Sequence, residues 1–195
     1  MKNSMVFIAL LTALALTACA TTKLSNEKYK PPSAGDVLPD IKLPVPKDGR
    51  LQEYLGVSGA GLFSVNQIKA DIVIIKLFSV YCPLCHKDAP KMNQLDAKIE
   101  SSLELKGRLK LIAIGASNSI QQVAQFKEEY GLKFPVFADG NGSIHQQLGS
   151  VKFPYYMGVK LDGGHNARIF YARLGQIQDT DTFLQSILRT SEKWQ

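Results

Sequence analysis

The fold is decided by residues 72–90, IVIIKLFSVYCPLCHKDAP. Residues 72–80 form a nearly continuous apolar run rich in β-branched side chains, which is typical of a central strand buried on both faces. Pro83 suits the first turn of a helix, where its missing N–H costs no hydrogen bond. Apolar residues then recur at helical spacing, so we predict a helix from Pro83 to about Leu103. A buried strand should therefore run directly into a helix, with two cysteines at the junction.

The rest of the chain continues the alternation of strands and helices and ends in a hairpin and a helix. The stretch 43–61 is rich in Gly and Pro and is predicted to be a loop with short edge strands. βαβ units followed by an antiparallel hairpin predict an α/β fold, a mixed sheet with helices on both faces. The other predicted elements are a strand over 108–116, a helix over 120–130, an extended segment over 135–138, a short helix over 143–148, a hairpin of 155–161 and 167–174, and a helix starting near Asp179.

Cys82 and Cys85 carry the chemistry that the sequence predicts. Thiol–disulfide exchange requires a thiolate, an accessible sulfur and a second thiol that resolves the mixed disulfide. Cys82 is expected at the N-terminus of the helix, where unpaired N–H groups and the macrodipole stabilise a thiolate. Cys85 lies one turn further on and is predicted to be the buried, resolving thiol. Between the two cysteines, Pro83 and Leu84 remove one N–H donor and add apolar cover, which should limit other reactions of Cys85. His86 is expected at the surface.

The N-terminus has the composition of an export signal. Lys2 supplies a positive charge, and the apolar run after it is too short for a comfortable membrane span of about 20 residues. Residues 16–19, LTAC, resemble the bacterial lipobox, in which the cysteine is acylated and becomes the first residue of the mature protein. We therefore predict lipidation at Cys19. By resemblance to Gram-negative sorting rules, Ala20 favours a periplasm-facing lipoprotein of the outer membrane.

Length and composition fit one domain behind a leader. The chain has 195 residues, of which 45% are hydrophobic and 21% charged. The net charge is +6, but the lysines are scattered and no basic run is interleaved with aromatic residues, so no nucleic-acid partner is predicted. A single CxxC is half of a four-cysteine zinc site, and no metal is predicted. The predicted organisation is a lipoprotein signal peptide over 1–18, a tether over 19–34 and a globular domain over 35–195.

Four segments of the domain follow a recognisable pattern. GDVLPDIKL over 35–43 matches G-x-x-x-P-D-x-x-L, and FPVFAD over 134–139 matches F-P-V-x-x-D. LFSVYCPLCHKDAP over 77–90 matches F-W-A-x-W-C-P-P-C-x-x-E-x-P. VKFP over 151–154 matches a segment that holds a cis-proline. On these segments the chain resembles the thioredoxin superfamily and, within it, the TlpA/ResA-like redoxins, which are membrane-tethered extracytoplasmic thiol–disulfide oxidoreductases. The resemblance implies a thioredoxin-like fold.

The resemblance also implies roles for residues around the two cysteines. Pro154 corresponds to the cis-proline, which faces the cysteines and leaves the preceding backbone free to pair with an extended client. Tyr81 stands where the family has Trp, and Phe153 where a smaller residue is usual. Lys76 occupies the superfamily's buried-carboxylate position; either it pairs with an acid or reaches the edge, or its ammonium stabilises the thiolate of the first cysteine. The predicted substrate-binding and supporting residues are Tyr81, Pro83, Phe153, Pro154 and Lys76.

The function implied by the resemblance is disulfide exchange with exported proteins, more as a reductant than as an oxidant. Such a protein-disulfide oxidoreductase needs no cofactor besides the redox-active Cys82–Cys85 disulfide. Its clients are exported proteins with cysteines, among them apocytochrome c, and its electrons come from a membrane thiol donor. Acylated Cys19 would add the lipid bilayer as a partner.

Two other functions use the same fold. Peroxiredoxin-like thiol peroxidases carry Pro-x-x-x-Thr/Ser-x-x-Cys; Ser79 fits this pattern, but Ile75 stands where Pro is required. A copper chaperone would bind Cu(I) through both thiolates and a histidine, for which His145 is the candidate. That class usually spaces its cysteines by three residues. Both functions stay open as alternatives.

Overall fold

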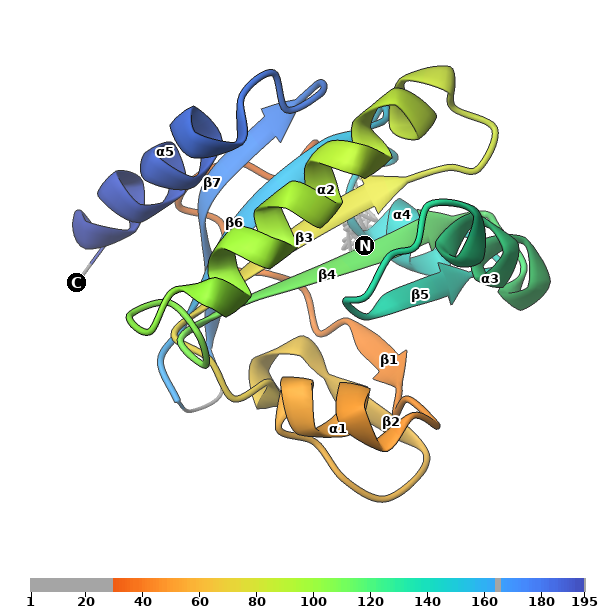
Figure 1. Cartoon of the computed structure of the whole chain (residues 1–195), viewed down its shortest axis with the longest axis horizontal. Coiled ribbons are helices and arrows are strands. Elements are labelled where there is room, and N and C mark those ends of the chain that lie inside the picture. Colours follow the sequence, from red (N-terminus) through yellow and green to blue (C-terminus); the bar gives the residue numbers. More distant parts are fainter. Residues whose placement is uncertain (1–29, 164–165, 195) are drawn as a thin grey trace, which may run out of the picture.

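The computed structural model describes residues 30–163 and 166–194 (Figure 1). The predicted signal peptide, Cys19 and most of the predicted tether lie outside the described residues. The elements are β1 Lys42–Pro44, α1 Gly49–Leu55, β2 Leu62–Ser64, a 3-10 turn Val65–Gln67, β3 Ile72–Phe78, α2 Pro83–Ser101, β4 Leu109–Ala116, α3 Ile120–Glu129, β5 Val136–Asp139, α4 Ser143–Gln147, β6 Tyr155–Leu161, β7 Ala167–Leu174 and α5 Thr180–Glu192.

The centre of the molecule is a five-stranded mixed sheet in the order β5-β4-β3-β6-β7. β3 pairs parallel with β4, and β4 parallel with β5. β6 runs antiparallel to β3, and β7 antiparallel to β6, so the predicted hairpin forms the far edge. This is the predicted α/β architecture, and it is thioredoxin-like. A separate pair, β1 with β2, packs beside the sheet.

Two hydrophobic cores, one on each face, hold the sheet. On one face lie α2 and α5, which run side by side across the sheet, together with apolar side chains of α3 (Figure 1). On the other face lie α4, Leu55 of α1 and the segment that precedes β1. All seven residues of β3 are buried, as the apolar run predicts for a central strand. β3 therefore has no freedom to shift, because a slip of one residue would exchange its two buried faces.

The stretch 43–61 contains a helix that the sequence analysis missed. The predicted short strands are present as β1 and β2, but α1 lies between them. Asp48 caps α1 by accepting from the Arg50 N–H at 2.9 Å, and Gly56 ends it in the left-handed conformation. Asp and Gly are residue types typical of the two helix ends, so the sequence holds a signal for α1. The many other glycines of the stretch led to the prediction of a loop instead.

Tyr54 of α1 completes the edge of the sheet. β5 covers β4 only from Ala113 onward, so the first half of β4 has a free edge there. The Tyr54 hydroxyl accepts from the Leu111 N–H at 2.8 Å and lies 3.4 Å from the Leu111 carbonyl. A side chain thus supplies the hydrogen bonds that a strand would otherwise make.

Element boundaries otherwise differ from the predicted ones by one or two residues. β3 ends at Phe78 rather than at residue 80, and α2 ends at Ser101 rather than near Leu103. α5 begins after Asp179, near the predicted start, and the Asp179 side chain caps the helix by accepting from the Thr182 N–H.

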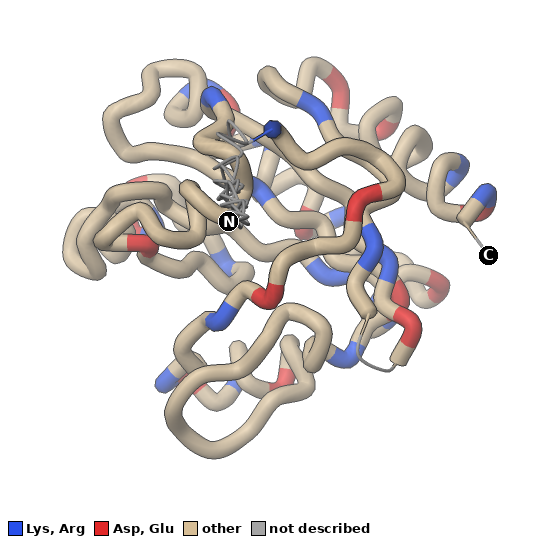
Figure 2. Tube along the Cα trace, turned by 180° about the vertical axis from the view of Figure 1, so that it is seen from behind, with Lys and Arg blue, Asp and Glu red and all other residues tan. Residues whose placement is uncertain are grey.

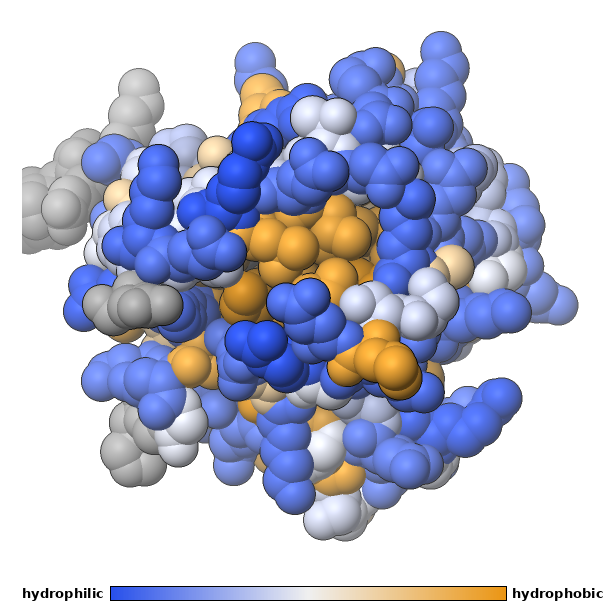
Figure 3. Space-filling model, turned by 60° about the vertical axis from the view of Figure 1, so that its left-hand side comes forward, coloured by the Kyte–Doolittle hydropathy of each residue, from blue (hydrophilic) through white to orange (hydrophobic). Residues whose placement is uncertain are grey.

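The surface fits a protein with dispersed charge. Lys and Arg are interspersed with Asp and Glu along the described chain, without a continuous basic stretch (Figure 2). One face shows an apolar area at its centre with hydrophilic residues around it (Figure 3). Within residues 30–163 and 166–194, no helix combines the length and hydropathy that a bilayer crossing requires.

Asp96 is a buried carboxylate without full compensation. Its Oδ1 has no hydrogen-bond partner among the described residues, and Glu100 lies one helical turn further along α2. Burial and the charge of Glu100 raise the pKa of Asp96 from 3.8 to about 6, against the opposing charges of Lys110 and Lys133. The ionised form is therefore disfavoured in the folded chain.

We expect Asp96→Asn to stabilise the protein at pH 7.5 but not at pH 4. Because the folded state holds the Asp96 proton more tightly than the unfolded chain, the wild type loses stability as pH rises from about 4 to about 6. The amide removes this loss, so urea unfolding should show a gain of about 1–2 kcal/mol at pH 7.5. The surface variant Asp181→Asn is the control and should change stability by under about 1 kcal/mol at either pH. An equal effect of Asp96→Asn at both pH values would contradict the assignment.

Candidate active site

The two cysteines lie where β3 gives way to α2. Cys82 is the N-cap residue of α2 and is partly exposed, whereas Cys85 is fully buried. Both are free thiols, and the Cys85 N–H donates to the Cys82 carbonyl at 2.9 Å. Pro83 is the first residue of the helix, as predicted. One sulfur is therefore open to a reaction partner, and the other is available only from within.

The second wall of the site is the loop before β6. The Phe153–Pro154 peptide bond is cis, as the family pattern implies. The carbonyl oxygen of Phe153 lies 3.7 Å from the Cys82 sulfur. The register of the sheet brings this loop to the cysteines, because Tyr155 pairs with Leu77 at the end of β3. Two segments about 70 residues apart in sequence thus form one site.

Apolar side chains surround Cys82 on the surface. Tyr81 is 71% exposed and Leu84 is 45% exposed, although both are large and apolar. The Tyr81 hydroxyl is hydrogen-bonded to the Gln122 side chain at the start of α3. Phe153 is half-buried, with its ring 4.8 Å from that of His145. This collar gives a client peptide apolar surface beside the reactive sulfur.

His86 is partly exposed, and its ring joins three elements. Its Nε2 is 2.7 Å from the Val80 carbonyl, and its Nδ1 is 2.7 Å from the Tyr130 hydroxyl. Since a carbonyl only accepts, Nε2 carries the proton and donates to Val80. The Val80 N–H in turn donates to Asn118 at 3.0 Å. The loop that leads from β3 to Cys82 is therefore fixed by polar contacts from both α2 and the β4–α3 turn.

Beneath Cys85 lies a buried ion pair. Lys76 Nζ is 2.8 Å from Asp88 Oδ2, and the side chains are only 3% and 0% exposed. Asp88 also accepts from the Tyr156 hydroxyl and, at 2.9 Å, from the Ile177 N–H. Lys76 thus pairs with an acid, as one of the two predictions for this residue stated. The acid is the residue that occupies the family's acidic position three residues after the second cysteine.

Cys85 is held as a neutral thiol. Burial, and next the hydrogen bond with Cys82, raise the pKa of Cys85 from 9.0 to about 12, while the Ser79 backbone and the charge of Lys76 oppose the shift. A thiol with a raised pKa is a poor nucleophile toward outside reagents at neutral pH. Such a thiol can still attack a disulfide bond that is held directly beside it.

We expect Cys85 in the Cys82→Ser variant to be alkylated very slowly near neutral pH. At pH 8 iodoacetamide should label it on the order of 100-fold more slowly than free cysteine, with the rate still rising at pH 10, because little thiolate forms in the buried site. The Cys85→Ser variant is the matched control, and its exposed sulfur should be labelled at neutral pH. A labelling rate for Cys85 that levels off below pH 9 would refute the assignment.

Fold and site together define a class, the thioredoxin-fold proteins with a dithiol at the N-terminus of the helix that follows the central strand. The chain belongs to the AhpC/TSA family, whose sequence model matches residues 34–175.

Individual relatives are consistent with the predicted resemblance. The chain is 30% identical over 99 residues to the thiol-disulfide oxidoreductase ResA of Bacillus thuringiensis, covering 51% of this chain and 54% of that protein. It is 24% identical over 157 residues to ResA of Oceanobacillus iheyensis, covering 80% and 73%. The chain thus spans about half the length of the Bacillus relatives it matches. A provisionally named thiol:disulfide interchange protein DsbE from Chlorobium tepidum superposes with a TM-score of 0.62 at 20% identity, covering 81% of this chain and 97% of that one, which supports the fold.

The structure adds residues to the site that sequence reasoning did not assign. Tyr156 and Ile177 complete the shell around Asp88, and Asn118 fixes the loop before Cys82. None stands in a motif, and each reaches the site only through sheet pairing or a turn. His145, the candidate copper ligand, has its Nε2 2.9 Å from the Val151 carbonyl. Among the described residues no three His, Cys, Asp or Glu side chains gather as a metal-binding group.

Proposed function

We propose that this protein is a thiol–disulfide oxidoreductase that exchanges disulfides with client proteins through Cys82 and Cys85, mainly as a reductant. The observation that carries the proposal is the contrast between the two sulfurs. Cys82 is partly exposed at a helix N-terminus beside the Phe153 carbonyl, and Cys85 is buried one turn below it. The similarity to ResA oxidoreductases supports the same activity.

The reaction has two steps. The Cys82 thiolate attacks one sulfur of a client disulfide, a new bond joins that sulfur to Cys82, and the other client sulfur leaves as a thiolate. Cys85 then gives up its proton and attacks the Cys82 sulfur. The client's first sulfur leaves as a thiolate, and the Cys82–Cys85 disulfide remains. Two electrons have passed from the dithiol to the client, and a membrane thiol donor returns the protein to its reduced form.

We place this reaction in the periplasm, outside the cytoplasmic membrane, in a periplasm-facing lipoprotein anchored through Cys19. The support is the lipobox-like segment 16–19 and the polar tether after it. Clients are exported proteins with cysteines, apocytochrome c among them. The outer membrane is the proposed destination because Ala20 follows the lipidated cysteine.

Replacing each cysteine separately tests the activity. Cys82→Ala should abolish insulin reduction, because Cys85, the other cysteine of the described residues, is fully buried. Cys85→Ala should instead accumulate a mixed disulfide with the client, visible as a mass increase that dithiothreitol reverses.

The reduction potential of the Cys82–Cys85 couple tests the direction of electron flow. A value near −270 mV would support the reductant role, and one near −120 mV would indicate an oxidant. Hydrogen peroxide turnover comparable to insulin reduction would favour the peroxidase alternative.

Lys76→Met tests whether the buried ammonium stabilises the reactive sulfurs. Removing this charge should move the pH profile of Cys85 alkylation, measured in the Cys82→Ser background, to higher pH and slow insulin reduction by roughly tenfold, because the charge of Lys76 favours the Cys85 thiolate. Asp88→Asn is the matched control. It retains the ammonium and removes the opposing carboxylate, so it should move the profile to lower pH. Identical Cys85 profiles with and without Lys76→Met, both in the Cys82→Ser background, would rule out an electrostatic role for Lys76.

A further inference from the structure

Three exposed cations lie on segments that border the proposed site. Lys87 is on α2, three residues after Leu84 and therefore on the same side of the helix. Lys152 directly precedes Phe153, whose carbonyl is 3.7 Å from the Cys82 sulfur. Arg173 lies near the end of β7. We call Lys87, Lys152 and Arg173 the basic flank.

Arg173 is tied to the cysteine motif by two hydrogen bonds. Its Nη2 donates to the Gln176 carbonyl at 3.1 Å, and the Gln176 amide donates to the Leu84 carbonyl at 3.1 Å. The neighbouring Gly175 N–H donates to the Pro154 carbonyl at 2.9 Å. The end of β7 is thereby held against both the cysteine helix and the cis-proline loop. The guanidinium is thereby held on the side of α2 where Leu84 is exposed.

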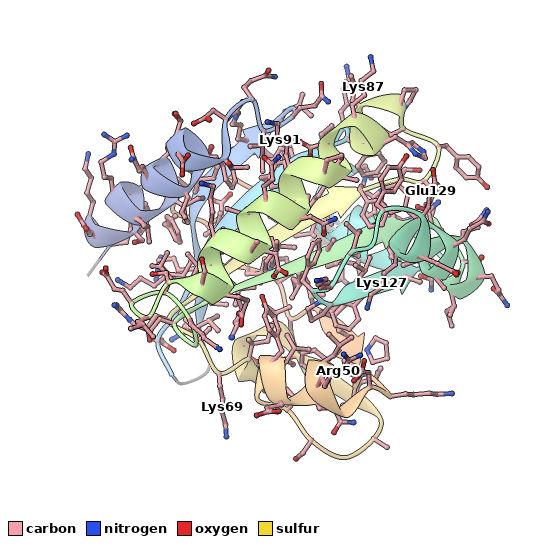
Figure 4. All side chains as sticks on the ribbon, viewed as in Figure 1. Arg50, Lys69, Lys87, Lys91, Lys127 and Glu129 are labelled. Atoms are coloured by element: carbon pink, nitrogen blue, oxygen red, sulfur yellow. The ribbon has the colours of Figure 1, made fainter. Side chains whose placement is uncertain are left out.

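Within the described residues, no carboxylate neutralises the basic flank. None of its three cations makes an ion pair, whereas other exposed cations do, for example Arg108 with Asp71 at 2.8 Å. Asp88, the acid next to Lys87 in sequence, is buried and accepts from Lys76. Figure 4 shows Lys87 and Lys91 pointing outward from α2, with Glu129 at the end of α3. The three cations of the basic flank thus come from α2, β7 and the loop that holds the cis-proline.

We propose that the basic flank selects client segments that carry acidic side chains next to the exchanging cysteine. This inference rests on the proposed function, whose site it surrounds. An apolar collar with unpaired cations on its rim is complementary to a peptide with an apolar or small residue at the cysteine and carboxylates beyond it. Rim charges act mainly on the rate of encounter, and the preference weakens as salt is added.

Matched peptides test the proposal. Three octapeptides carry one cysteine as a mixed disulfide with uncharged 2-mercaptoethanol, flanked by Glu, Gln or Lys. At low ionic strength we expect the kcat/KM for the Glu peptide to exceed that for the Lys peptide by roughly tenfold, and the ratio to fall toward one at 0.5 M NaCl. Because both peptides react with the same sulfur, the ratio cancels any change in the intrinsic reactivity of Cys82.

Charge variants assign the preference to named residues. Lys87→Gln/Lys152→Gln/Arg173→Gln should bring the ratio close to one, with the Gln peptide little affected. Lys87→Glu and Lys152→Glu alone should each lower it by about two- to threefold. Lys69→Glu is the control, since Lys69 is exposed at the lower edge of Figure 4, far from α2's first turn, and it should leave the ratio unchanged.

The outcomes separate the two proposals. Exchange with none of the three peptides would reject the oxidoreductase function itself. Exchange with all three at equal rates at low salt would leave that function standing and overturn the inference. If the rates are equal and the triple variant instead loses binding to phosphatidylglycerol vesicles, the basic flank serves a lipid surface and not a client.

Discussion

The constraint on which the rest of the structure depends is the burial of β3 on both faces. All seven of its residues are buried, and β4 and β6 pair with it on either side. Its end at Phe78 therefore fixes where α2 can begin, and α2 fixes the depth of each sulfur. The same pairing sets Leu77 opposite Tyr155, so the cis-proline loop must arrive beside Cys82. A site made of two distant segments thus follows from one strand that cannot slip.

The same strand places Lys76 in the core. Burying its ammonium costs free energy of folding, and the groups around it offset that cost. An isolated buried ammonium would be destabilised by several kcal/mol. Here Asp88 neutralises Lys76, and the Tyr156 and Ile177 donors use the remaining lone pairs of the carboxylate. Tyr156 is itself the register partner of Lys76 on β6. Charge, hydrogen bonds and sheet register agree at this point, which keeps a polar group beneath Cys85 without leaving an unpaired charge.

Much of the fold could be predicted because its signals are local. The apolar run of β3, Pro83 at the first turn of α2 and the start of α5 near Asp179 each depend on residues close in sequence, and each was predicted to within two residues. What could not be predicted depends on contacts across the sheet. The contacts of His86 could not be predicted because nothing in its own stretch indicates that Tyr130, 44 residues away, would bond to it. The sequence left two predictions open for Lys76 for the same reason, since the position of α2 over β3 decides which acid it meets.

The two sulfurs differ in a way that orders the proposed reaction. Burial raises the pKa of Cys85 and keeps it protonated, so it does not compete with Cys82 for a client and is protected from outside oxidants. Once Cys82 is bonded to a client, its sulfur is the electrophile nearest to Cys85, one helical turn away. Cys85 then reacts because it is held close to that sulfur, although its pKa is high. Lys76 opposes the rise in the pKa of Cys85. The cation under the helix therefore acts when the buried sulfur must lose its proton, which is the step that releases the client. Exposure selects the sulfur that begins the exchange, and the buried pair bears on the sulfur that ends it.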